Sequence, residues 1–283
     1  MKKILFTTLV CLLALTACQD EPTSRDGAIE TFTVNGVSFN MVKVKGGSFT
    51  MNMEYVLWKK YVLFQDSTMT VTLPDYSIGQ TEVTQALWQA VMGNNPSLFS
   101  SGNEDFINAL DSLGVDLEYA DDLNRPVEWV TDSECETFIA RLNELTGRNF
   151  RLPTEAEWEF AASGGNQGHG YQYAGSDSFD EVAWCRENSD QMTHPIDHIM
   201  THPVGQKKPN ELGLYDMSGN VMEWCDSYVT LWYYSGMHRE KAFLRITRGG
   251  SWGNDADPCK VSYRAGFYPG GRSNNVGLRL AMW

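Results

Sequence analysis

The loss of regular periodicity after Gly164 constrains this chain more than any other feature. From there to the C-terminus, about 120 residues are punctuated by glycine, asparagine and proline, with only short strand-like runs such as "AFLRITRGGSW" and "VGLRLAMW". Irregular chain of this length is typical of a functional surface or of a fold stiffened by metal. Aromatic residues make up 12% of the sequence and supply side chains for a buried core. We therefore expect one large, loop-rich domain.

The first half of the chain carries conventional signals for secondary structure. Alternating apolar and polar residues on both sides of Asn35-Gly36 predict a β-hairpin. Three helices are predicted: "TEVTQALWQAVMG", which ends at Gly93; "TDSECETFIARLNELTG", in which Thr131 and Glu134 form a capping box; and "LPTEAEWEFAASGG", in which Thr154 is the N-cap. The polar insertion 94–124 between the first two is expected to be partly helical.

Several charged and aromatic residues outside these patterns receive structural interpretations. Arg151 with Glu155 and Glu159 predicts a salt-bridged helix start, with a catalytic carboxylate pair as the alternative. The aromatic run "SYVTLWYYSGMH" is expected to fill gaps between loops, with an exposed binding surface as the alternative.

The N-terminus has the pattern of an export signal. In "MKKILFTTLVCLLALTACQD", two lysines, an apolar run and small residues precede a cysteine, which predicts a secretory signal peptide over residues 1–17 that is too short to span a membrane. Its end resembles a bacterial lipobox, so we expect lipid attachment to Cys18 and a polar tether over 18–30. An ordinary cleaved signal is the alternative. Gln19 replaces the aspartate that favours inner-membrane retention, which predicts an outer-membrane lipoprotein, periplasmic or surface-facing.

The chain is strongly acidic. Its net charge is −14, and loss of residues 1–17 removes Lys2 and Lys3 and no acids, which gives −16. A body of this charge repels nucleic acid, so no nucleic-acid partner is expected, and the membrane contact is assigned to the lipid anchor.

Six ordered segments resemble the formylglycine-generating enzyme family, also called the sulfatase-modifying factor domain. They are "MVKVKGGSFTM", "IGQTEVTQALWQAVMGNNPS", "RPVEWVTDSECETFIARLNELTGRNFRLPTEAEWEFAA", "HPVGQKKPNELGLYDMSGNVMEWCDSY", "RITRGGSWGNDADPCKVSYR" and "NNVGLRLA". The resemblance covers nearly everything from Phe39 onward. It implies a single α+β domain over 31–283, related to C-type lectins, low in regular secondary structure and calcium-bound. It also places Trp252 in the loop that forms the family's substrate cleft.

The same resemblance implies a copper site that this chain carries only in half. In family enzymes, two cysteines after the RGGS motif hold copper and, with oxygen, oxidise a sulfatase cysteine to formylglycine. Here the second falls at Cys259, but the first falls at Asn254. An amide cannot replace a thiolate for Cu(I), so copper is not expected and Cys259 is catalytic only if an unusual site exists. Otherwise Cys259 is expected to be a buried thiol or a disulfide partner, with Cys225 as the favoured mate among four cysteines that allow three pairings.

Calcium is the cofactor that the resemblance favours. In "YDMSGNVMEW", two carboxylates flank a tight turn, which suits a hard cation that takes six to eight oxygen ligands. The expected ligands are the side chains of Asp216 and Glu223 and the carbonyls of Gly219 and Val221. Turn stabilisation by backbone hydrogen bonds is the alternative. A second family site would use Asn188 and the carbonyl of Ser189, with Asp197 as a further acid.

Three functions are compatible with these patterns. The first is a lipid-anchored, non-catalytic, calcium-stabilised binding or scaffold protein of the cell envelope, with a peptide, a glycan or an envelope protein in its cleft. The second is a copper-dependent oxidase that converts a sulfatase cysteine to formylglycine. The third is a ligand-binding variable protein of a diversity-generating retroelement, although the C-terminal segment lacks the dense asparagine, tyrosine and serine run that adenine mutagenesis leaves.

Overall fold

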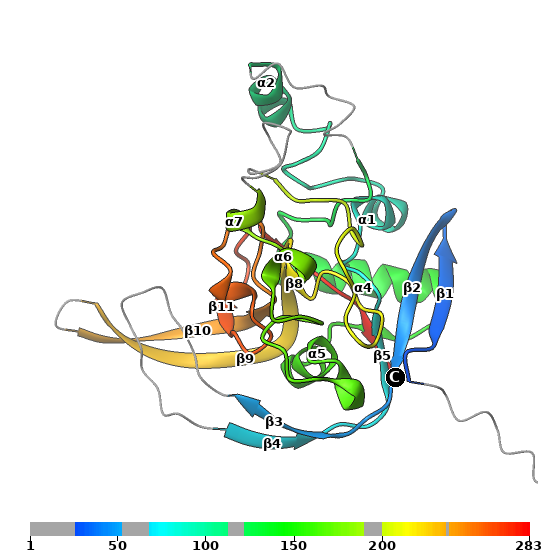
Figure 1. Cartoon of the computed structure of the whole chain (residues 1–283). Helices are drawn as coiled ribbons and strands as arrows, with labels where there is room; N and C mark the ends of the chain where they lie inside the picture. The colour runs from blue at the N-terminus through cyan, green and yellow to red at the C-terminus, as the bar shows by residue number, and fades with distance from the viewer. Residues whose placement is uncertain (1–25, 53–67, 113–121, 190–199, 236–237) are drawn as a thin grey trace, which may run out of the picture.

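A five-stranded antiparallel sheet joins the two ends of the domain. In the computed structural model, which describes residues 26–52, 68–112, 122–189, 200–235 and 238–283, the strand order is β1-β2-β5-β13-β6. These strands are β1 (Ile29–Val34), β2 (Val37–Val44), β5 (Tyr76–Gly79), β13 (Ala281–Met282) and β6 (Phe150–Arg151). The predicted hairpin is confirmed, because β1 and β2 are joined by Asn35 and Gly36 at φ values of 48° and 85°. The last strand, β13, pairs with both β5 and β6, so the end of the chain lies inside the sheet, between these two strands (Figure 1).

The predicted helices are also confirmed. They are α1 (Gln85–Met92), α4 (Asp132–Thr146) and α5 (Glu155–Ala162), and both capping boxes form. Trp88 of α1 stacks on Phe138 of α4 with ring centroids 4.8 Å apart, inside the core cluster that packs under the sheet. The insertion contributes α2 (Glu104–Ser112), which stands away from the rest of the domain in Figure 1. None of the helices in the described part of the chain has the length and apolar composition needed to cross a bilayer.

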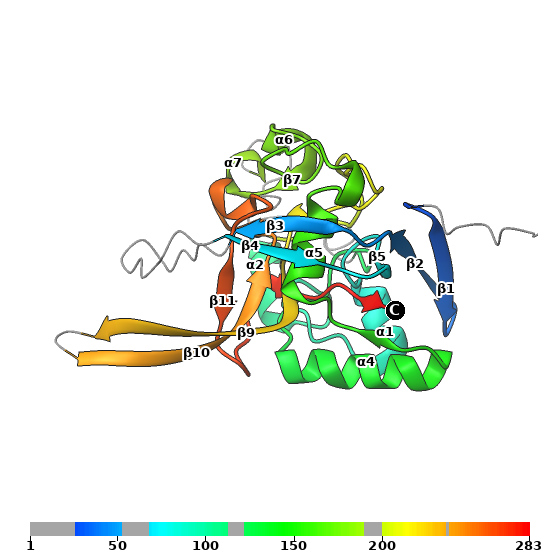
Figure 2. The ribbon, with the colours of Figure 1, turned by 90° about the horizontal axis from the view of Figure 1, so that it is seen from below.

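The second sheet corrects the expectation of short strands in the C-terminal half. Its order is β11-β10-β9-β12, with β9 (Met222–Ser235), β10 (His238–Arg248), β11 (Ala265–Phe267) and β12 (Val276–Gly277). Strands β9 and β10 form a long antiparallel ribbon that projects well beyond the body of the domain (Figures 1 and 2). The run expected to fill gaps between loops is therefore mostly strand. The β-branched and aromatic run "YVTLWYY" before Ser235-Gly236 and the run "AFLRIT" further along the chain are strand signals that the sequence interpretation missed.

The remaining elements are short. They are β3 (Ser48–Asn52), β4 (Thr68–Thr72), α6 (Phe179–Val182), β7 (Ala183–Trp184), α7 (Arg186–Ser189), β8 (Ser218–Gly219) and the 3₁₀ turns Gly165–Gln167 and Asp257–Cys259. Long connections between them are irregular, as expected, and the mixture of helix and strand in one domain confirms the α+β class.

The three glutamates of α5 form ion pairs with three arginines. Glu157 pairs with Arg151, Glu159 pairs with Arg248, and Glu155 pairs with Arg264 and also, through Oε1 at 3.6 Å, with Arg248 Nε. The prediction that Arg151 pairs with Glu155 and Glu159 is therefore wrong: Arg151 reaches the N3 glutamate at 2.6 Å. The other two carboxylates turn inward to arginines that come from the C-terminal sheet and loops. Paired in this way, they tie α5 to that sheet.

Candidate functional site

The loop that follows β10 begins with a tightly packed pair of glycines. Gly249 and Gly250 have φ values of 95° and 67°, a backbone region that glycine adopts without steric cost. A Cβ atom on Gly250 would lie 2.7 Å from the Sγ atom of Cys259 and from the carbonyl oxygen of Pro258. Glycine at this position therefore lets the loop fold back on Cys259.

Asn254, which the resemblance places at the family's first copper cysteine, works as a turn residue. Its Oδ1 atom accepts a hydrogen bond from Ser251 Oγ at 2.7 Å, and its N–H donates to the Ser251 carbonyl at 3.0 Å. Its own carbonyl accepts the N–H of Arg186 at 2.8 Å. These bonds close the loop locally and join it to α7, and they offer no thiolate to a soft metal.

Cys259 is fully buried and contacts another cysteine. Its Sγ atom lies 4.0 Å from the Ser251 carbonyl and 3.8 Å from the Asp255 carbonyl, and Cys185 belongs to the same buried cluster. Interaction with the Cys185 side chain and burial raise the pKa of the Cys259 thiol well above its usual range, so the neutral thiol is favoured. The favoured pairing with Cys225 is wrong, because Cys225 and Cys259 lie in different core clusters. The two-cysteine copper arrangement of the family therefore does not fit this loop.

The turn between Asp216 and Glu223 brings the expected calcium residues together around a strained backbone. Asp216 and Asn220 adopt positive φ values of 55° and 59°, with Gly219 between them and Val221 next in the chain. Glu223, however, is fully engaged: both carboxylate oxygens accept from the Arg279 guanidinium, and Oε2 also accepts from Trp158 Nε1 at 2.6 Å. Its role in the structure is that of the partner of Arg279.

Asp216 keeps one oxygen available. Its Oδ2 atom accepts the N–H of Gly205 at 2.6 Å, whereas Oδ1 is buried without a hydrogen-bond partner in the described structure. Burial raises the pKa of Asp216 to about 6. An orphaned carboxylate oxygen in a turn fits the hard, oxygen-seeking character of calcium.

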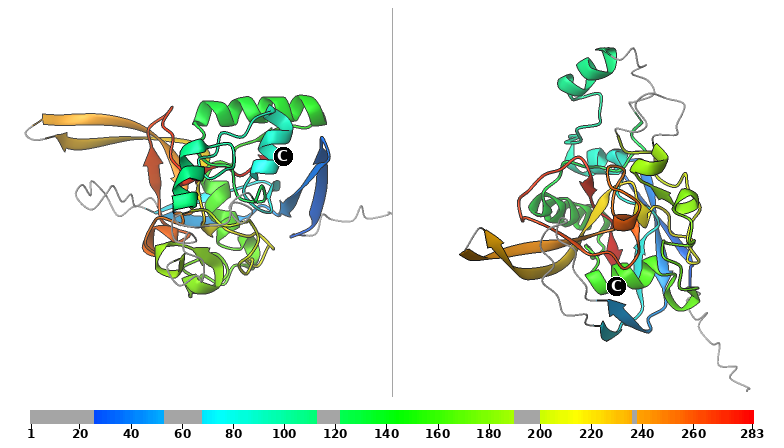
Figure 3. Two further views of the ribbon diagram at one scale, coloured as in Figure 1. Left: turned by 90° about the horizontal axis from the view of Figure 1, so that it is seen from above. Right: turned by 60° about the vertical axis from the view of Figure 1, so that its left-hand side comes forward.

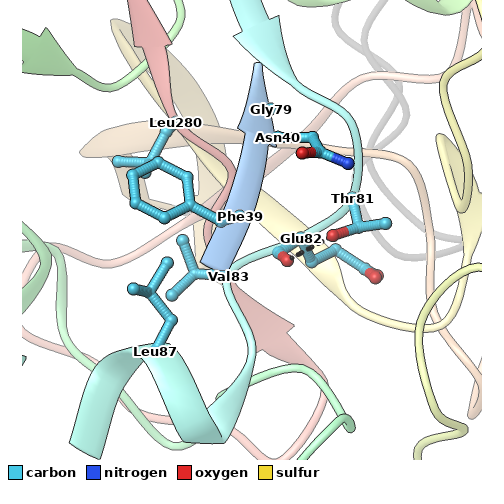
Figure 4. Close-up of a pocket in the computed structure, with 8 residues that line it drawn as sticks. All are labelled: Phe39, Asn40, Gly79, Thr81, Glu82, Val83, Leu87 and Leu280. Carbon is cyan, nitrogen blue, oxygen red and sulfur yellow. Dashed lines mark hydrogen bonds between the residues drawn. The ribbon is translucent and has the colours of Figure 1, made fainter. Parts of the chain in front are cut away.

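Glu82 is a third carboxyl group in this cluster that sequence analysis missed. It accepts the N–H of Val221 and the Nδ2 amide of Asn220, each at 3.3 Å. Burial, and then the charge of Asp216, raise the pKa of Glu82 well above its usual range. Figure 4 shows Glu82 beside Thr81 on the polar side of a small pocket, opposite its apolar lining residues.

The buried negative charge of this cluster favours a bound cation, whereas its side chains are not arranged as a set of metal ligands. Three buried carboxyl groups, Glu82, Asp216 and Glu223, face the single guanidinium of Arg279. In the described part of the chain, no three histidine, cysteine or carboxylate side chains converge as a metal site. A calcium ion here would depend on Asp216 and on backbone carbonyls of the turn.

The second expected calcium set is described only in part. Asn188 uses its side chain inside its own loop: Oδ1 accepts the Cys185 N–H at 3.0 Å and Nδ2 donates to the Ala183 carbonyl at 2.7 Å. Ser189 ends α7, and Asp197 lies outside the described residues, as does the expected lipidation site Cys18.

Trp252 lies between the RGGS loop and the insertion. Its Nε1 atom donates to the Asn274 carbonyl at 3.1 Å, and the edge of Phe99 meets its ring with centroids 5.6 Å apart. Phe99 belongs to a small apolar cluster with Phe106 and Leu110 of α2, against which Trp252 packs. The insertion thus covers part of the surface that the resemblance assigns to the substrate cleft.

The β9–β10 ribbon carries an exposed aromatic pair. Tyr228 and Phe243 stack face to face, with ring centroids 5.0 Å apart and planes inclined by 8°. They remain 47% and 55% exposed, respectively. Strand pairing outside the ribbon is limited in the described residues: β11 pairs only with 245–247 of β10, and β12 only with 222–223 of β9. Among the described residues, no further strand lies beside either outer edge of the projecting part (Figure 3).

Comparison with known proteins extends over almost the whole chain. The family model described as "Sulfatase-modifying factor enzyme 1-like domain" matches residues 27–282. The "Chaperone protein LppX" of Paenibacillus barcinonensis is 32% identical over 99% of this chain and 98% of its own length. The "Formylglycine-generating enzyme" of Streptomyces coelicolor is 35% identical, over 46% of each protein.

A solved structure gives the same fold. "Treponema denticola variable protein 1" superimposes with a TM-score of 0.67 at 30% sequence identity, covering 90% of this chain and 98% of that one. This agreement confirms the expected fold of the family in a single domain.

Proposed function

The chain belongs to the sulfatase-modifying factor enzyme 1-like domain family, and from this premise we propose that it is a non-catalytic binding protein that holds partner polypeptides in the cell envelope. The projecting β9–β10 ribbon is the observation that carries the proposal, because it combines strand edges that no other described strand pairs with and an exposed aromatic stack.

A ribbon of this kind suits an extended polypeptide. Unpaired backbone N–H and C=O groups at a strand edge can add a further strand, which contributes affinity through main-chain hydrogen bonds. The ring pair of Tyr228 and Phe243 supplies a rigid apolar contact beside that edge. The net charge of −14 adds a preference for segments that carry basic residues.

The loop chemistry disfavours oxidation of a sulfatase cysteine. Asn254 holds the place of one thiol and is committed to Ser251, while Cys259 is buried against Cys185. Copper oxidation needs thiolates that the incoming substrate thiol can join. A loop without them can retain the recognition role of its fold and lose the reaction.

Relatives support the same class of role. One full-length relative bears the name of a chaperone, and a polypeptide-holding activity in this chain would agree with it. We further propose that the chain is exported and anchored through lipid on Cys18 as an outer-membrane lipoprotein, and that calcium, held by Asp216 and the carbonyls of Gly219 and Val221, stiffens the turn.

Similarity to a variable protein favours a second candidate, ligand binding by the C-terminal segment in a diversity-generating system. A reverse-transcriptase gene and a template repeat beside this gene are expected under that candidate. Their absence would remove it.

The primary proposal is tested by suppression of aggregation. Full-length protein is mixed at equimolar ratio with malate dehydrogenase at a temperature that unfolds the dehydrogenase, and light scattering is followed. We expect at least a two-fold reduction in scattering relative to an equal mass of serum albumin. Equal scattering in the two samples would contradict the binding role.

The oxidase alternative has its own measurement. A Cys-x-Pro-x-Arg peptide is incubated with the protein, copper and oxygen and is then analysed by mass spectrometry. We expect the peptide thiol to remain intact. An aldehyde product that disappears in a Cys259→Ser variant would establish the oxidase in place of the binding protein.

A further inference from the structure

Two cysteines from distant parts of the sequence meet inside the domain. Cys185 follows β7 and Cys259 ends the 3₁₀ turn after the RGGS loop, and both side chains have no exposed surface. Both lie in one apolar cluster that includes Tyr173, Val182 and Ala256, and the Cys185 side chain is close enough to raise the pKa of the Cys259 thiol. The contact pairs two thiols in a closed, apolar setting.

The backbones on either side of the two cysteines are held together by several contacts. The Arg186 N–H donates to the Asn254 carbonyl at 2.8 Å, and its guanidinium donates to the Gly253 carbonyl at 2.6 Å. Glu187 accepts the Ala256 N–H at 2.9 Å. Because these bonds fix the two segments in register, the thiols meet at high effective concentration whenever the domain folds.

We propose that Cys185 and Cys259 form a disulfide bond in the exported protein. Each thiol loses one proton and one electron, an S–S bond forms, and a small-molecule disulfide such as oxidised glutathione accepts the two electrons and two protons as it is cleaved to two thiols. The exchange proceeds through a mixed disulfide on one cysteine, which the other then displaces. It takes place while the segments are still accessible during folding.

The surroundings favour a disulfide over a soft-metal site. A disulfide is neutral and suits the apolar cluster, whereas two-coordinate metal binding requires both sulfurs as thiolates. The negative charge of Glu187 opposes thiolate formation at Cys259. Cys135 and Cys225 have no such cysteine contact in the described structure and are expected to remain thiols.

This cross-link goes beyond the proposed function: it rests on the proposed export of the chain and not on polypeptide binding. It would fasten the loop that carries Asn254 to α7, and it would withdraw the surviving family cysteine from metal chemistry. A failure to bind polypeptides would leave the disulfide in place, and a missing disulfide would leave the ribbon unaltered.

Peptide mapping tests the proposal directly. The full chain is produced by export into the bacterial periplasm, treated with oxidised glutathione, alkylated in denaturant and digested with trypsin without reduction. We expect a linked pair of peptides, 152–186 with 249–260, which separates after reduction. Recovery of both peptides as alkylated thiols would overturn the proposal. So would their recovery as thiols in a protein that carries a stoichiometric copper ion.

Stability provides a second readout. The oxidised protein should melt about 5 °C or more above the reduced protein, because a cross-link that closes a long loop restricts the unfolded chain. Cys185→Ser and Cys259→Ser should each abolish this redox-dependent shift, while Cys135→Ser should keep it. If either variant fails to fold, the shift of the unmutated chain still decides, and its absence would contradict the cross-link.

Discussion

Arg279 holds Glu223 in a fully buried ion pair. Its Nε atom donates to both carboxylate oxygens at 3.0 Å, and Nη2 donates to Oε1 at 2.8 Å. The same guanidinium donates to the carbonyls of Gly79 and Tyr215, so it joins β5, the loop before β8 and the start of β9. One side chain from the last motif of the chain therefore organises the acidic cluster.

Loss of Arg279 should destabilise the domain strongly. Arg279→Met leaves the Glu223 carboxylate buried without its cation, which we expect to cost about 3–5 kcal/mol of the free energy of unfolding in urea. The double variant Arg279→Met, Glu223→Gln removes the isolated charge and should recover part of the loss. Equal stability of the single variant and the unmutated chain would contradict the assigned role of the pair.

Glu128 should make the stability of the domain depend on pH. Burial raises its pKa from 4.5 to about 8, against the opposing effect of hydrogen bonds from Phe99 and Leu98. The folded state then binds the proton more tightly than the unfolded state, so this contribution to stability is full below pH 4.5 and is lost as the pH rises through 8.

The matched variant for this prediction is Glu128→Gln, which keeps an acceptor for the Phe99 N–H. Urea unfolding between pH 5 and 9 should show a flatter profile for the variant, with a gain of about 2–4 kcal/mol over the unmutated chain at the alkaline end. Parallel profiles for the two proteins would show that Glu128 titrates normally.

The elements that could be predicted from the sequence are those that depend on residues close together in the chain. The capping box of Thr131 and Glu134 and the turn at Asn35-Gly36 are local, and each forms as predicted. The order of the family motifs was sufficient for the fold, because those motifs extend over the whole domain.

The contacts that could not be predicted from the sequence join residues far apart in the chain. Nothing near Cys259 in sequence indicates Cys185, and the partner of Glu223 comes from the last strand-like run. The ribbon was missed for another reason: the aromatic residues of "YVTLWYY" were assigned to loops, although β-branched and aromatic residues favour strands. An arginine within an apolar run, as in "VGLRLAMW", indicates a buried arginine that forms an ion pair with a buried acidic residue.

Calcium should stabilise the protein through Asp216. We expect millimolar calcium, compared with excess chelator, to raise the melting temperature by about 3 °C or more, because a ligand that binds only the folded state shifts the equilibrium towards it. Asp216→Asn should lose most of this rise, since it removes the negative charge of the carboxylate to which the unpartnered Oδ1 belongs. Asp105→Asn, on exposed α2, serves as the control and should keep the full effect. An equal rise in all three proteins would place the ion elsewhere.

The aromatic stack on the ribbon should carry much of the polypeptide binding and little of the stability. Tyr228→Ser and Phe243→Ser each remove one ring of an exposed pair, and we expect the double variant to need about ten-fold more protein for the same suppression of scattering. The free energy of unfolding of the double variant should fall by only about 1 kcal/mol. The fall arises chiefly from the lost contact between the Tyr228 ring and the Arg245 guanidinium, which lies 5.1 Å from the ring centroid. Tyr171→Ser removes an aromatic ring of 38% exposure away from the ribbon and should leave binding unchanged.

If Tyr171→Ser weakens binding as much as the ribbon double variant, contact is spread over the surface and the ribbon is not its site. If the ribbon variant binds normally, the exposed edges alone, or another surface, must hold the partner.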